Sequence, residues 1–89
     1  MNTIPRSALG QLSDLSDRDL LAQLHLAAQA EHRATSHLVA LLMELDSRRL
    51  YLGEGFPSLF AYCTDALHLS EPAAYNRIEV ARAARRFLY

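Results

Sequence analysis

Arginine, tyrosine and asparagine side chains gather near the end of this sequence, at spacings suited to binding a nucleic acid. The candidates are Tyr75, Asn76, Arg77, Arg82, Arg85 and Arg86. Guanidinium groups pair well with phosphates and with guanine, and an amide side chain can read a base edge. We expect Arg82, Arg85 and Arg86 to hold phosphates. The other three residues would lie nearest the groove of DNA.

The elements that would position these side chains form a helix-turn-helix pattern over 58–87. It consists of a helix over about 59–67, a turn at His68, and a second helix capped by Ser70. Pro72 suits the first turn of that second helix, where its missing N–H is not needed. In a helix-turn-helix, the second helix can enter the major groove of DNA.

A long helix is predicted before this pair. Ser16 followed by two aspartates is typical of a helix start, and neither glycine nor proline interrupts the chain before Gly53. We therefore expect one helix over 17–49, followed by a loop over 50–57. Residues 1–15 carry little pattern and are predicted to form a weakly structured leader, so the helices would make a single domain over 16–89.

The long helix carries an apolar stripe that extends beyond what two shorter helices can cover. Its residues follow a spacing of three and four: Leu20, Leu24, Ala27, Ala34, Leu38, Leu41 and Leu45. An apolar stripe that these helices leave uncovered is expected to pack against a second copy, another domain or a bend of the same chain. We expect a homodimer, or a contact with a C-terminal domain that is missing from this sequence.

Composition and charge agree with an all-α protein. Of the 89 residues, 51% are hydrophobic, and only 3 are glycine and 3 proline. The fold we expect is one long helix packed against a helix-turn-helix pair. The net charge is −1, every cationic side chain is arginine, and six of the nine arginines follow position 46. This distribution favours a local basic surface. The use of arginine alone suits phosphate or guanine contacts, but a high-GC genome also favours arginine codons.

The remaining polar residues indicate no catalytic or metal site. The four histidines lack metal-ligand spacing, Cys63 has no partner, and Asp65 and Glu71 lack a base–nucleophile arrangement. We therefore expect no enzyme activity, no cofactor and no metal. The sequence has neither a signal peptide nor an apolar run of about 20 residues, which predicts a cytoplasmic protein without a membrane contact.

Three segments, RRLYLGEGFPSLFAYCT from Arg48, HLSEPAAYNRI from His68 and ARAARRF from Ala81, resemble a known family. They are similar to the helical region that precedes the catalytic domain in a group of bacterial HNH endonucleases. The match runs from about Leu20 to Phe87. It implies an accessory region, because the paired His and Asn residues of the HNH nuclease, which surround a divalent metal, are not in this sequence.

Two functions from different classes stay open at this point. The arginine-rich last helix favours DNA binding by an accessory region that is not itself catalytic. The long leucine stripe favours self-association or docking to a partner, without any nucleic acid.

Overall fold

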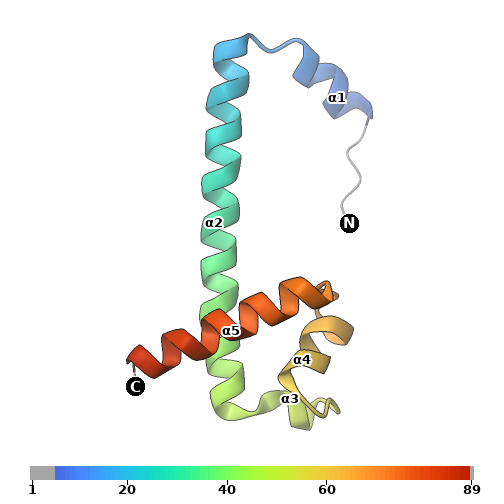
Figure 1. Ribbon diagram of the computed structural model, residues 1–89. Helices are drawn as coiled ribbons and strands as arrows, with labels where there is room; N and C mark the ends of the chain where they lie inside the picture. Colours follow the sequence, from blue (N-terminus) through green and yellow to red (C-terminus); the bar gives the residue numbers. More distant parts are fainter. Residues whose placement is uncertain (1–5, 89) are drawn as a thin grey trace. The chain divides into compact units, whose positions relative to one another are not determined.

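The computed structural model describes residues 6–88, which form helices and contain no strand. In chain order the elements are α1 (Arg6–Ser13), α2 (Asp17–Arg48), α3 (Leu50–Gly53), α4 (Leu59–Ala61), the π-helical turn η1 (Tyr62–Ala66) and α5 (Glu71–Leu88). The all-α prediction of one long helix packed against a helix-turn-helix pair is confirmed (Figure 1).

The chain divides into two units, Met1–Arg33 and Ala34–Tyr89, with the boundary inside α2. The single domain over 16–89 stays a prediction. The helix-turn-helix pair and the second half of α2 together form the second unit.

Both ends of α2 have local causes. The Ser16 hydroxyl accepts a hydrogen bond from the Asp19 backbone N–H at 3.1 Å, which is the cap predicted from the sequence. The helix ends at Arg48, one residue before the predicted end. Arg49 adopts a left-handed conformation with φ of 50°, which interrupts the helical backbone.

Two segments are more helical than the sequence predicted. The leader was expected to be weakly structured, yet 6–13 form the helix α1; residues 1–5 lie outside the described part of the chain. The loop predicted over 50–57 begins instead with the short helix α3. This helix, Leu50–Gly53, follows directly after Arg49. Gly55, with φ of 92°, provides the turn that follows.

The helix-turn-helix pair has the predicted turn residues but an irregular first helix. The Ser58 hydroxyl caps it by accepting from the Ala61 backbone N–H at 3.0 Å. The expected α-helix over 59–67 widens after α4 into η1, where the Leu67 N–H donates to the Tyr62 carbonyl at 3.1 Å. His68 is left-handed as predicted, with φ of 59°. The Ser70 hydroxyl then caps α5 at 3.3 Å.

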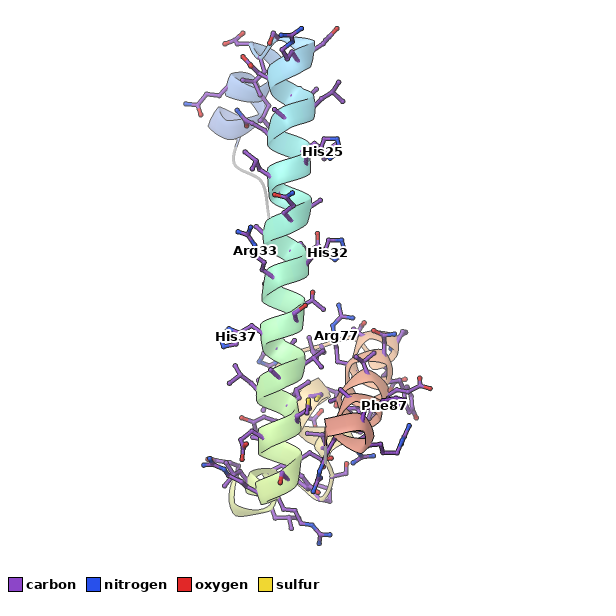
Figure 2. The ribbon with its side chains drawn as sticks, turned by 90° about the vertical axis from the view of Figure 1, so that its left-hand side faces the viewer. His25, His32, Arg33, His37, Arg77 and Phe87 are labelled. Atoms are coloured by element: carbon purple, nitrogen blue, oxygen red, sulfur yellow. The ribbon has the colours of Figure 1, made fainter. Side chains whose placement is uncertain are left out.

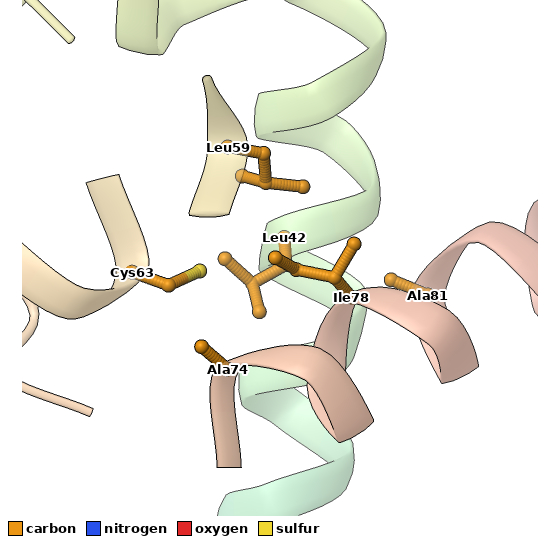
Figure 3. Close-up of a cluster of buried hydrophobic side chains, with 6 residues drawn as sticks. All are labelled: Leu42, Leu59, Cys63, Ala74, Ile78 and Ala81. Carbon is orange, nitrogen blue, oxygen red and sulfur yellow. The ribbon is translucent and has the colours of Figure 1, made fainter. Parts of the chain in front are cut away.

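The core of the second unit lies where α5 crosses the second half of α2 (Figure 1). Figure 3 shows its buried side chains: Leu42, Leu59, Cys63, Ala74, Ile78 and Ala81. The two alanines keep this face of α5 thin, so the helix can approach α2 closely around Leu42. Burial raises the pKa of the Cys63 thiol, which therefore remains in its neutral form.

The apolar stripe of α2 has two different environments. In the second unit, Leu38 and Leu45 pack against the core around Leu42. In the first unit, Leu20, Leu21 and Leu24 are exposed. None of the described helices combines the length and the hydropathy that a membrane span requires.

Candidate nucleic-acid interface

Asp46 organises the arginines of α5. The Arg82 guanidinium donates two hydrogen bonds to this carboxylate, from Nε to Oδ2 at 3.2 Å and from Nη2 to Oδ1 at 3.4 Å. Arg85 Nη1 lies 4.0 Å from the same Oδ2 atom. These hydrogen bonds raise the pKa of Arg82, so its guanidinium group stays protonated. One carboxylate therefore holds Arg82 by hydrogen bonds and lies within ion-pair distance of Arg85.

A polar strip runs along α5 beside these ion pairs. Tyr75, Glu79, Arg82 and Arg86 follow a spacing of four, three and four, which places them on one side of the helix. They line a surface depression of about 380 Å³ together with Ile78, a residue of the buried core. We call this set, Tyr75, Ile78, Glu79, Arg82 and Arg86, the α5 depression. It joins an aromatic ring, an apolar contact and two guanidinium groups.

Tyr75 is held in place by an aromatic neighbour. Its ring centroid lies 4.7 Å from that of Phe60, with 35° between the ring planes. Phe60 is half-buried and packs against the core, whereas Tyr75 is 65% exposed. Tyr75 therefore exposes its ring to solvent while it packs against Phe60. This contact limits the rotamers available to the Tyr75 side chain.

The residues predicted to lie nearest the groove do not form one surface. Successive residues of a helix are separated by about 100° around its axis, so Tyr75, Asn76 and Arg77 point in three directions. Only Tyr75 lies on the α5 depression. Arg77 is half-buried, and its Nη1 donates a hydrogen bond to Asn76 Oδ1 at 2.7 Å.

The three arginines predicted to hold phosphates, Arg82, Arg85 and Arg86, lie close together, but they differ in their ion pairs. Arg82 and Arg85 share Asp46, and all three line one open hollow with it. Arg82 pairs with Asp46 of α2 rather than with Glu79, its neighbour at i,i+3 on α5. No carboxylate of residues 6–88 lies within ion-pair distance of Arg86, so its charge faces solvent.

The outward face of α5 is apolar rather than basic. Val80 is exposed, and Phe87, labelled in Figure 2, is 90% exposed. This face is poorly suited to reading base edges, which needs hydrogen-bonding side chains. The candidate interface is therefore the flank of α5 that carries the arginines.

The histidines of α2 do not meet. Figure 2 shows His25 and His32 on one side of the helix in the first unit, with Arg33 on the other. Seven residues of helix separate these two histidines by about 10 Å. Within the described chain no three His, Cys, Asp or Glu side chains are grouped so that they could hold a metal ion.

Sequence reasoning missed Asp46 and Phe60. Asp46 follows the leucine stripe of α2, and its side chain is only 11% exposed. The sequence held no clear signal for this pairing, because Asp46 lies 36 positions before Arg82 and only the crossing of α5 over α2 brings them together. Phe60 packs against the core and also supports the Tyr75 ring.

Comparison of the chain with protein-family models, with curated proteins and with solved structures finds no match. The interpretation of this surface therefore depends on its own geometry.

Proposed function

We propose that the second unit binds the phosphate backbone of DNA through Arg82, Arg85 and Arg86. The observation that carries the proposal is the Asp46-centred arrangement, in which a carboxylate fixes Arg82 and draws Arg85 toward it, while Arg86 remains available. Fixed guanidinium groups lose less conformational entropy when they bind an anion. Phosphate contact of this kind is independent of base sequence.

The charge balance makes this binding weak. Asp46 and Glu79 offset two of the three guanidinium charges, so few phosphates are neutralised. For each phosphate neutralised on duplex DNA, the logarithm of the binding constant falls by about 0.9 per unit of the logarithm of salt concentration. Association is therefore expected at low ionic strength and with a shallow salt dependence.

Fluorescence anisotropy with a labelled duplex tests this assignment. Arg86→Gln removes the unpaired charge and should weaken binding to every sequence equally, reducing the salt slope by about one unit. Arg48→Gln is the matched control, because Arg48 is exposed on α2 and pairs with Glu44 at 2.8 Å. Binding that survives in Arg86→Gln but is lost in Arg48→Gln would move the interface to the end of α2.

The resemblance to HNH endonucleases gives the proposal its context. An accessory region of such a nuclease would hold DNA while another domain cuts it, in the cytoplasm. On that view this chain alone is not catalytic. Purified protein incubated with plasmid and Mg²⁺, Mn²⁺ or Zn²⁺ should leave the plasmid intact, and cleavage that persists through repurification would overturn this part of the proposal.

A second candidate function, self-association, is favoured by the leucine stripe of the first unit. Leu20, Leu21 and Leu24 of α2 are exposed and lie within about one turn of the helix. The matching face of a second copy has the same length and residues. Burying three leucines in each copy would contribute favourably to a dimer through the hydrophobic effect. This association would leave the α5 depression unchanged.

A further inference from the structure

We infer that the α5 depression is a stacking site for one unpaired nucleotide, so that the protein prefers single-stranded over duplex nucleic acid. This inference rests on the proposed phosphate binding and adds to it a ligand class, an unpaired base. It arises from the juxtaposition of Tyr75 with Arg82 and Arg86 around a hollow that the phosphate role alone does not use.

The tyrosine ring provides the stacking surface. Tyr75 is 65% exposed, and Phe60 supports its ring at a centroid distance of 4.7 Å. A base that stacks on the ring extends this aromatic pair to three members. Base–aromatic stacking is the main sequence-tolerant contact of single-strand-binding proteins.

The rest of the depression matches the other parts of a nucleotide. Ile78 contributes an apolar contact for a base edge, and Arg86 lies where it can meet the adjoining phosphate. The Glu79 carboxylate repels phosphate, but it can accept a hydrogen bond from the amino group of cytosine. The volume of about 380 Å³ is at the small end of ligand sites, which run from about 300 to 1,000 Å³.

A duplex cannot use this site in the same way. Its bases are paired and stacked on each other, so a base must first leave the helix, at a cost of a few kcal/mol. This cost is small in a single strand, because its bases are already unpaired. Duplex DNA would therefore contact only the arginines, and single-stranded DNA would contact both the arginines and the tyrosine.

Three probes of equal length separate these contributions: an oligodeoxycytidine of about 15 nucleotides, an abasic strand with the same phosphates, and a duplex. Wild-type protein should bind the oligodeoxycytidine about 5- to 150-fold more tightly than the abasic strand. Tyr75→Ala should lose that difference. Tyr75→Phe is the matched variant, which keeps the ring and should keep the preference.

Each result has a defined meaning. Equal affinity of wild type for the oligodeoxycytidine and the abasic strand would overturn the stacking site, while arginine-dependent duplex binding would still support phosphate recognition. Absence of binding to all three probes would overturn the proposed function as well. If a circular dichroism melt shows that Tyr75→Ala is misfolded, the affinities of wild type and Tyr75→Phe for the oligodeoxycytidine and the abasic strand still test the stacking site.

Discussion

Asp46 and Arg82 are 36 positions apart in the sequence, yet they face each other across the α2–α5 crossing with two hydrogen bonds of 3.2 and 3.4 Å. The pair connects the last turns of α2 to the middle of α5. Asp46 is mostly shielded, whereas Arg82 remains about half exposed. The contact therefore has two consequences: it stabilises the crossing, and it sets the direction of a cationic side chain at the surface.

A double-mutant cycle on this pair should give a coupling of about 1 kcal/mol, near the upper end of the range for solvent-accessible ion pairs. The variants are Asp46→Ala, Arg82→Ala and their combination, each measured by urea unfolding. The cycle cancels the separate effect of removing a negative charge from the carboxyl end of α2. The corresponding Asp46–Arg85 cycle is the control and should be smaller, because that contact spans 4.0 Å. Equal couplings would contradict the geometry.

Two adjacent leucines of α2 should differ greatly in their effect on stability. Leu42 is 2% exposed and lies in the core, whereas Leu41 is 56% exposed. Leu42→Ala should therefore cost about 2–5 kcal/mol of unfolding free energy, from lost burial and the cavity left behind. Leu41→Ala, the same change one position away, should cost well under half of that. Similar losses in chemical denaturation would show that α5 crosses α2 on another side.

The Cys63 thiol should be protected from alkylation in the folded protein. It is fully buried, and its raised pKa keeps it neutral, whereas the thiolate is the reactive form. Because the folded pKa lies above the unfolded one, this group contributes its stability at neutral pH and loses it as pH rises through the folded pKa. Iodoacetamide labelling followed by mass spectrometry should be slow, and faster in Leu42→Ala. Rapid labelling of the wild type at neutral pH would contradict this.

Self-association should depend on one face of α2. Leu24 and Leu26 are almost equally exposed, at 62% and 65%, but their positions on the helix differ by about 200°. Leu24→Glu should therefore reduce the mass measured by light scattering at high concentration, and Leu26→Glu should not. If both variants and the wild type are monomeric at every concentration, the leucine stripe does not mediate association. If only Leu26→Glu dissociates, the opposite face does.

Much of the fold could be predicted because its signals are local. Ser16, Ser58 and Ser70 each accept the backbone hydrogen bond that their position before a helix indicates. His68 has the left-handed backbone expected in the turn. Helix starts and turns depend on a few neighbouring residues, so a single sequence contains enough information to place them.

The parts that could not be predicted depend on distant contacts or small local differences. Arg82 could pair with Glu79 one turn away or with Asp46 on another helix, and only the crossing of α5 over α2 decides between them. The left-handed Arg49 that ends α2 has no marker comparable to a glycine. The π-helical widening at η1, which holds the buried Cys63, likewise has no marker comparable to a glycine or proline.

The most direct test of the central claim is a nuclear magnetic resonance titration of labelled protein with single-stranded and duplex DNA at low salt. The side-chain signals of Arg82 and Arg86 should shift with both ligands, and the Tyr75 ring signals should shift more strongly with the single strand. Signals of Arg48 and of the first unit should stay in place. Shifts centred on Arg48 and Arg49, or no shifts with either DNA, would contradict nucleic-acid binding by α5.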